Sequence, residues 1–128
     1  MNNNTHKRTK YYIETVNILS SLSNVATLKV GALVTNSEGE LISVGYNTSP
    51  VFTSNPEDLY EITLHAEELA LLKCKEEGYL LVCTHAPCLS CASKIFVAGI
   101  KEVWYLNDYK TDKGLEFLNN AGIKTLKI

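Results

Sequence analysis

Two short motifs of this sequence hold residues of the types that bind zinc. The first is His65-Ala66-Glu67, and the second runs from Pro87 to Cys91 (Pro-Cys-Leu-Ser-Cys). One imidazole and two thiolates suit Zn²⁺, and three protein ligands leave the fourth tetrahedral position for water, as in catalytic rather than structural sites. The residue types therefore predict zinc-dependent hydrolysis, with the metal held by His65, Cys88 and Cys91.

Glu67 has the position of a general acid and base in such a site. Successive helical residues are turned by about 100°, so Glu67 points away from His65 while staying at the same helix end. A carboxylate there can take a proton from water as the water attacks an amidine-like carbon. It can then deliver that proton to the ring nitrogen and to the departing amine. The two motifs together therefore indicate hydrolytic deamination.

The elements expected around the motifs can bring them together. Residues 64–77 are predicted to form a helix, and residues 80–84 a strand. Such a helix carries the chain roughly 20 Å away, and the strand returns it by a similar length. The second motif opens another predicted helix, over residues 88–98, which ends at Gly99. The amino ends of both helices then point at one spot, where their dipoles favour thiolates.

The remaining pattern predicts an α/β fold with a mixed five-stranded sheet flanked by helices. Residues 1–8 are polar and read as a flexible tail, and the apolar steps from Thr9 to Leu22 predict a helix. Strands that alternate with helices in the second half predict parallel strands, added to an antiparallel hairpin. We expect one domain over residues 1–128, with a long irregular connection over residues 47–62. The other expected elements are strands over 29–35, 41–46, 103–106 and 124–128 and a helix over 113–120.

The composition excludes several classes of protein. The chain has 128 residues, of which 45% are hydrophobic and 20% charged, an ordinary globular balance. No apolar stretch reaches the roughly 18 residues that span a bilayer, and the polar start lacks the apolar core of a secretory signal, so we expect a cytoplasmic protein with no membrane partner. A net charge of -2 argues against nucleic acid as a partner.

Other residues that could do chemistry have simpler interpretations. Cys74 and Cys83 are expected to be buried apolar residues within a helix and a strand rather than ligands of a structural zinc site. His85 either contacts a substrate or fills a loop. Glu68 is expected on the solvated face of its helix, and Arg8 in solvent.

The chain resembles a known family over most of its length. His-x-Glu followed by Pro-Cys-x-x-Cys is the signature of zinc nucleobase deaminases, and both motifs of this sequence match it. From about Leu22 to Ile128 the sequence resembles the cytidine-deaminase-like superfamily, and within it the deoxycytidylate (dCMP) deaminases. The stretches that carry this resemblance are 29–32, 45–50, 98–103, 108–115 and 121–123, of which Gly45-Tyr46-Asn47 is the most discriminating.

This resemblance implies a three-layer α/β/α cytidine-deaminase-like fold and conversion of dCMP to dUMP and ammonia, which supplies thymidylate synthesis. It implies that Asn47 contacts the deoxyribose, that the backbone N–H of Ala66 binds the pyrimidine carbonyl, and that Val30 lines the base pocket. Thr48 stands where the family has glycine and is a candidate for phosphate contacts, together with Lys29 and Ser49. Tyr109, past the end of its strand, is a candidate for lining the pocket.

The resemblance further implies a homo-oligomer, with dCTP and dTTP as candidate effectors. The chain departs from the family where Leu69 replaces an asparagine, and where Thr27 and Leu28 replace arginines. Two alternatives stay open. One is the same chemistry on a free nucleoside or base, or on a base in tRNA or single-stranded DNA; the other is a regulatory domain that kept its zinc.

Overall fold

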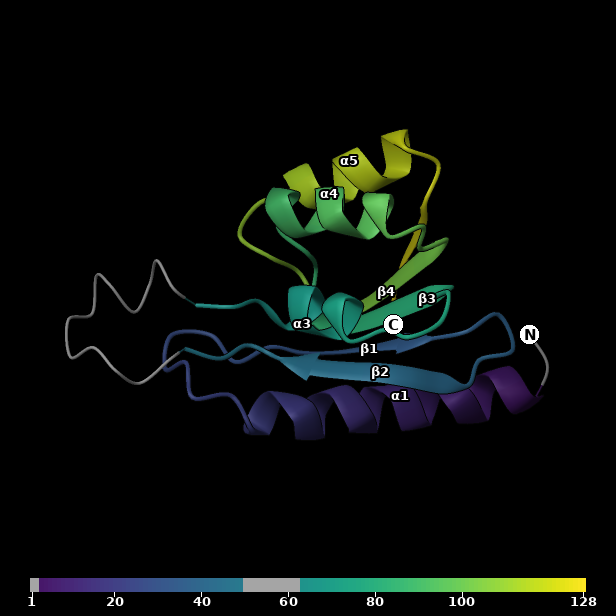
Figure 1. The fold of residues 1–128 in the computed structure, drawn as a ribbon, viewed down its shortest axis with the longest axis horizontal. Helices are drawn as coiled ribbons and strands as arrows, with labels where there is room; N and C mark the ends of the chain where they lie inside the picture. The colour runs from purple at the N-terminus through teal and green to yellow at the C-terminus, as the bar shows by residue number, and fades with distance from the viewer. Residues whose placement is uncertain (1–2, 50–62) are drawn as a thin grey trace.

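A mixed five-stranded sheet runs through the centre of the structure, a computed structural model that describes residues 3–49 and 63–128 (Figure 1). The strands lie in the order β2-β1-β3-β4-β5. β1 pairs antiparallel with both β2 and β3, whereas the β3–β4 and β4–β5 pairs are parallel. The expected mixed sheet is therefore confirmed. The strands are β1 (Gly31–Thr35), β2 (Leu41–Tyr46), β3 (Leu80–His85), β4 (Glu102–Asn107) and β5 (Lys124–Lys127).

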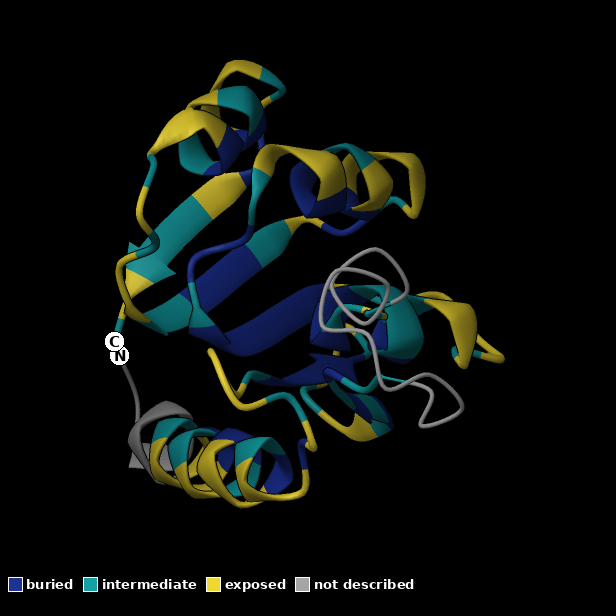
Figure 2. Ribbon diagram, turned by 90° about the vertical axis from the view of Figure 1, so that its left-hand side faces the viewer, coloured by how far each residue is buried: buried dark blue, intermediate teal, exposed yellow. Residues whose placement is uncertain are grey.

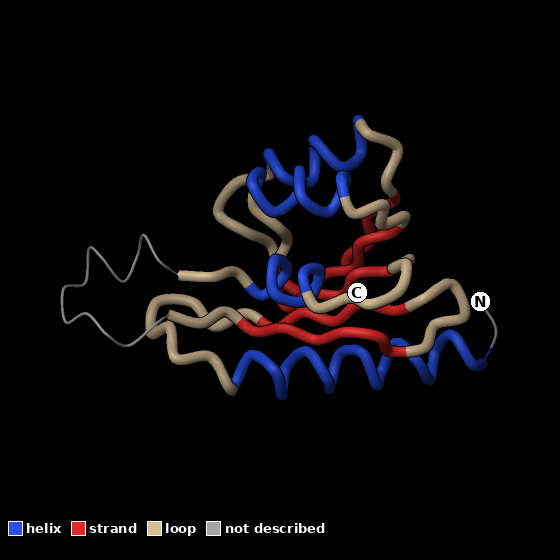
Figure 3. The backbone as a smooth tube through the Cα atoms, in the orientation of Figure 1, coloured by secondary structure: helices blue, strands red, loops and turns tan. Residues whose placement is uncertain are grey.

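The helices cover the two faces of the sheet unequally (Figures 1 and 3). Of the described helices, one, α1 (Asn3–Ser21), lies on one face. The opposite face carries α3 (Ala66–Leu72), α4 (Leu89–Val97) and α5 (Lys113–Asn120). The three layers match the α/β/α architecture that the resemblance implies, and both predicted zinc motifs lie on the face with three helices.

Strands β1 and β3 are buried on both sides, as Figure 2 shows in dark blue at the middle of the sheet. Side chains alternate between the faces, so Leu33 and Val82 pack toward α1, whereas Val34 and Leu81 pack toward α3 and α4. A strand that is buried on both faces must be apolar at nearly every position, which explains the continuous apolar runs of these two strands.

Helix α1 begins at Asn3, six residues before the expected start at Thr9, and replaces most of the expected tail. Two contacts with the β1–β2 turn hold it. The Arg8 guanidinium donates a hydrogen bond to the Glu38 carbonyl, and the Tyr12 hydroxyl donates to the Gly39 carbonyl at 2.5 Å. These partners lie about thirty residues away in sequence, so the local polar pattern could not indicate them.

Helix α3 ends at Leu72, five residues before the expected end at Glu77. Lys73 is its carboxyl-terminal cap. Of the residues up to the expected end, Lys75, Glu76 and Glu77 are charged and exposed, and glutamates at a carboxyl end oppose the helix dipole. The remaining boundaries lie within one or two residues of expectation, and residues 50–62 of the long connection lie outside the described part of the chain.

None of the described helices is both long and apolar enough to cross a bilayer.

We expect Leu33→Ala to lower the free energy of unfolding by about 2–5 kcal/mol, because the Leu33 side chain is wholly buried between β1 and α1 and its loss leaves a cavity. Urea unfolding checks this. Leu72→Ala is the control: Leu72 is 78% exposed, and its replacement is expected to change stability by less than about 0.5 kcal/mol. Equal effects of the two changes would contradict the assigned core.

Candidate metal centre

The amino end of α3 supplies the first motif. His65 is the amino-terminal cap of this helix, in extended backbone conformation, and Ala66 is its first residue. The Glu68 carboxylate closes a capping box, because it accepts a hydrogen bond from the His65 N–H at 3.4 Å. Ala66 and Ala70 are fully buried and hold the helix on the sheet. The imidazole is therefore fixed at a defined place on the sheet.

The amino end of α4 supplies the second motif. Cys88 is the cap residue of this helix, and its Sγ accepts a hydrogen bond from the Cys91 N–H at 3.5 Å. Cys91, Ala92 and Ile95 are fully buried and form the face by which α4 packs. Gly99 follows the end of the helix with a positive φ of 82°, a backbone conformation that only glycine adopts readily.

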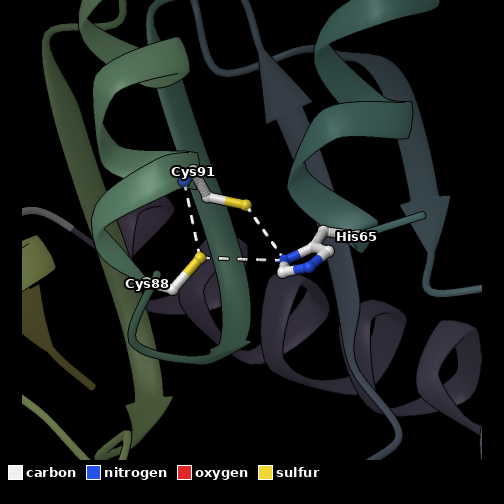
Figure 4. Close-up of side chains that lie close together, drawn as sticks. All are labelled: His65, Cys88 and Cys91. Atoms are coloured by element: carbon white, nitrogen blue, oxygen red, sulfur yellow. Dashed lines mark hydrogen bonds between the residues drawn. The ribbon is translucent and has the colours of Figure 1, made fainter. Parts of the chain in front are cut away.

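The three predicted ligands converge in space (Figure 4). His65 Nδ1 lies 3.3 Å from the Sγ of Cys91 and 3.8 Å from the Sγ of Cys88, and the three ligand atoms lie within 4.8 Å of one another. Tetrahedral zinc with Zn–N near 2.1 Å and Zn–S near 2.3 Å needs about 3.6 Å between nitrogen and sulfur. The two observed distances lie on either side of that value, so the donor set fits a zinc ion.

Glu67 lies beside this group and is only 5% exposed. Burial raises the pKa of its carboxyl group, because a low-dielectric surrounding disfavours the charged form. A carboxyl group with a raised pKa can both accept and return a proton near neutral pH. Glu67 therefore has the burial and the position expected of a general acid and base.

The two thiols, Cys88 and Cys91, differ in their pKa values. Hydrogen bonds from Cys91 and then from His65 lower the pKa of Cys88 to about 4, so this thiol is ionised. The hydrogen bond to the Cys88 thiolate raises the pKa of Cys91, which keeps its proton. The same thiolate raises the pKa of His65. The Cys88 thiolate is of the kind that zinc binds.

Asn47 and Val30 meet beside the amino end of β1. The Asn47 side chain accepts a hydrogen bond from the Val30 N–H at 2.8 Å and donates one to the Leu28 carbonyl at 2.6 Å. β1 begins at Gly31 rather than at the expected Lys29, and just before it the Val30 carbonyl accepts a hydrogen bond from the Asn47 N–H at 3.1 Å. Val30 is half-buried against the core under α3 and α4, on the face that carries the metal ligands. Asn47 therefore fixes the backbone of the segment that the resemblance assigns to the base pocket.

The other predicted substrate contacts are placed as follows. The N–H of Ala66 lies in the first turn of α3 and has no acceptor within the helix. Thr48 forms an isolated antiparallel bridge with Leu64, directly before His65. Tyr109 is half-buried, and its ring lies 5.6 Å from the Nζ of Lys110. The bridge places Thr48 near the first motif. Tyr109, by contrast, contacts Lys110.

The remaining candidates have structural partners. Cys83 is buried in the core, with its Sγ 3.7 Å from the Trp104 carbonyl, and Cys74 is half-buried, with its Sγ 3.4 Å from the Ala70 carbonyl. His85 Nδ1 lies 3.0 Å from the Thr84 hydroxyl. Within the described residues, the one group of three potential ligands is His65, Cys88 and Cys91.

Glu68 does more than the solvated role expected of it. Besides capping His65, its carboxylate accepts a hydrogen bond from the Lys94 Nζ at 2.8 Å and so links α3 to α4. The spacing of Glu68 three residues after the helix cap is the sequence signal that could have found the capping box. The ion pair joins two helices, and no local pattern indicates it.

Asn107 and Thr84 fix the segment that leads into the second motif, and sequence reasoning missed both. The Asn107 side-chain amide donates to the Thr84 carbonyl at 2.8 Å, and the main-chain carbonyl of Asn107 accepts from the Ala86 N–H at 2.9 Å. The Thr84 hydroxyl accepts from the Gly31 N–H at 3.1 Å. The segment before Cys88 is thereby tied to both neighbouring strands.

This site and fold agree with a known protein family. Residues 6–107 match the family described as "Cytidine and deoxycytidylate deaminase zinc-binding region". The chain belongs to this family. It is 32% identical to the deoxycytidylate deaminase of Saccharomyces cerevisiae over 88% of its own length, and it spans 42% of that protein. It is 34% identical, over 92% of its length and 82% of the other protein, to an uncharacterized deaminase of Aliivibrio fischeri.

A solved structure extends the likeness to the whole chain. The dCMP deaminase of cyanophage S-TIM5, solved in complex with dCMP and dUMP, superposes with a TM-score of 0.85 and 30% identity. The match covers 100% of this chain and 99% of the phage chain. The cytidine deaminase of Mycobacterium tuberculosis, at 19% identity and a TM-score of 0.58, shares the fold. The cytidine-deaminase-like fold is thus confirmed.

In the metal-free protein, we expect Cys88 to react with iodoacetamide at a rate that changes little between about pH 5 and pH 8. A thiol with a pKa of about 4 is ionised throughout that range. Mass spectrometry of labelled peptides measures each cysteine separately. Stoichiometric zinc is expected to block the reaction.

Cys74 is the internal control, because burial raises the pKa of its thiol and its rate should rise about tenfold per pH unit. Cys83, wholly buried, should stay unlabelled. A Cys88 rate that climbs with pH as steeply as that of Cys74 would contradict the assigned thiolate.

Proposed function

We propose that this protein is a zinc-dependent deaminase that converts dCMP and water to dUMP and ammonia. The observation that carries the proposal is the convergence of one imidazole and two thiols within 4.8 Å, beside a buried carboxyl group. Full-length similarity to a phage dCMP deaminase supports the choice of substrate.

His65, Cys88 and Cys91 would hold the zinc ion, and the ligand distances described above fit it. Zinc, when bound, supplies a Lewis acid that makes water a nucleophile near neutral pH. The Cys88 thiolate would bring negative charge to the metal, and Cys91 would do so after it loses its proton on binding. Three protein ligands leave room for a fourth ligand, which a structural Cys₃His or Cys₄ site would not.

Glu67 moves the protons of the reaction. Its carboxylate accepts a proton from the water that attacks C4 of the cytosine ring and passes this proton to the ring nitrogen N3. A second proton follows the same route to the exocyclic amine, which leaves as ammonia. Burial keeps bulk water from competing for these protons, and it raises the pKa of Glu67 so that both transfers are possible.

The substrate contacts form the outer part of the proposal. The unused N–H of Ala66 would bind the pyrimidine carbonyl, Val30 would pack against the base, and Asn47 would reach the deoxyribose with the hydrogen-bonding capacity that Leu28 and Val30 leave free. Thr48 is held by its bridge to Leu64 next to the ligand His65, and its hydroxyl is a candidate phosphate donor. A role for Tyr109, the homo-oligomer, control by dCTP and dTTP, and the cytoplasmic location stay predictions.

We expect Glu67→Ala to reduce the rate of ammonia release from dCMP by about 10²- to 10⁴-fold, because the proton carrier is lost. Zinc content, measured by atomic emission, should stay near one ion per chain. Glu77→Ala, which removes an exposed carboxylate beyond the end of α3, is the control and should keep full activity. Activity that survives Glu67→Ala would contradict the assigned role.

Cys88→Ala is expected to remove both zinc and activity, because two protein ligands hold zinc weakly. Cys74→Ala is the matched control, since Cys74 is a thiol outside the ligand group, and it should retain both. Zinc retained by Cys88→Ala would show that the ligand set is wrong.

We expect dCMP to give the fastest ammonia release among dCMP, CMP, dCTP, deoxycytidine, cytosine and a cytosine-containing oligonucleotide. A mononucleotide site depends on one phosphate, whereas an oligonucleotide site loses binding steeply with salt. Preference for an unphosphorylated compound or for the oligonucleotide would keep the zinc chemistry and replace the substrate. If the zinc-bound protein released no ammonia from any of these compounds, the result would favour a regulatory domain.

A further inference from the structure

Two glycines, Gly45 and Gly114, lie against the backbone of the two segments that carry the metal ligands. Both are places where a neighbouring main chain occupies the volume that a side chain would need. Gly45 is in β2, under the first turn of α3, and Gly114 is in α5, against the residues that open α4. The two contacts therefore lie on opposite sides of the ligand group.

Gly114 touches the chain at the ligand Cys88 itself. A Cβ atom on Gly114 would lie 2.0 Å from the Pro87 carbonyl oxygen and 3.0 Å from the Cys88 carbonyl oxygen. Since Cβ atoms essentially never come within 3.0 Å of such atoms, an alanine would have to widen the first contact by half or more. All of the nearest atoms are main-chain atoms, so no side-chain rotation can relieve the overlap.

Gly45 touches α3 next to His65 and Glu67. A Cβ atom on Gly45 would lie 2.4 Å from the Ala66 carbonyl oxygen and 2.7 Å from the Ala70 N atom. An alanine there would lift the first turn of the helix away from β2. This turn carries both the imidazole ligand and the carboxyl group that is proposed to move protons.

Neither contact can open without cost, because the elements on both sides are anchored. Helix α5 is held by Leu118, which is wholly buried. The segment before Cys88 is held by the bond from the Ala86 N–H to the Asn107 carbonyl. Helix α3 is held on β2 by the Ser43 hydroxyl, which donates to the Ala70 carbonyl at 2.6 Å.

We propose that Gly45 and Gly114 are positioning residues for the metal centre: their missing side chains set the separation between His65 on one side and Cys88 on the other. A zinc site tolerates deviations of only about 0.2 Å in its bond lengths, which is less than either substitution demands. The inference rests on the proposed zinc ligation and extends it to two residues that touch no metal.

The test is the zinc affinity of Gly114→Ala and Gly45→Ala, measured by competition with a chromogenic chelator. Each change is expected to weaken zinc binding by about 10- to 100-fold, the range found when residues that support metal ligands are altered. The visible spectrum of the Co²⁺-substituted protein is a second readout. Its ligand-field bands should shift, since they report the ligand geometry and not the stability of the fold.

Gly39→Ala is the control. Gly39 lies in the β1–β2 turn with a positive φ of 85°, so an alanine there is strained, and its Cβ atom would overlap the Arg8 guanidinium of α1. This turn follows Thr35, which pairs with Leu80 at the start of β3, and so lies at the opposite end of β3 from Cys88. Gly39→Ala should therefore lower the melting temperature while leaving zinc affinity within about twofold and the Co²⁺ spectrum unchanged.

The outcomes separate this inference from the proposed function. Wild-type protein that binds no zinc overturns the proposed function itself. Wild-type protein that binds zinc, with Gly45→Ala and Gly114→Ala binding it equally well, overturns the positioning role alone. The two glycines contact different pairs of elements. If one variant does not fold, the zinc affinity of the other still tests the inference. If neither folds while Gly39→Ala does, both positions serve the whole fold, and the inference is wrong.

Discussion

The place where β3 ends is the constraint on which the metal centre depends. α3 leads away from the edge of the sheet at which β3 and β4 end, and β3 returns the chain to that edge before α4 begins. β3 is locked between β1 and β4 by pairing on both sides and is buried on both faces, so its end point cannot slide. A shift by one residue would exchange the faces on which Val82 and Cys83 pack. The distance between His65 and Cys88 is thus fixed by the sheet rather than by the loop that carries the cysteine.

The electrostatics of the site follow from this convergence. Bringing two thiols and an imidazole together in a half-buried place lets them stabilise one thiolate by hydrogen bonds, which is the state that accepts a metal. Glu67, one residue past Ala66, is buried by the same packing. Its pKa rises for that reason. A single arrangement of two helix ends therefore prepares both the proposed metal ligands and the proposed proton carrier.

Much of this architecture could be predicted from the sequence because local patterns of residues determine it. The order of helices and strands, the mixed sheet and the convergence of the two motifs follow from periodicity, turn residues and helix caps. What could not be predicted depends on contacts between distant segments. The hydrogen bond from Arg8 to Glu38 joins α1 to the β1–β2 turn, and the side chain of Asn47 bonds the segment before β1. Gly114 gives no more signal than an isolated glycine in a helix, which usually has a packing reason.

X-ray absorption at the zinc edge of the metal-loaded protein counts the atoms that surround the metal and so tests the proposed ligand set. We expect one nitrogen at about 2.0–2.1 Å, two sulfurs at about 2.3 Å and one further light atom that the protein does not supply. Three or four sulfurs, or a first shell closed entirely by protein ligands, would contradict it, because no position would remain for the chemistry that Glu67 is placed to assist.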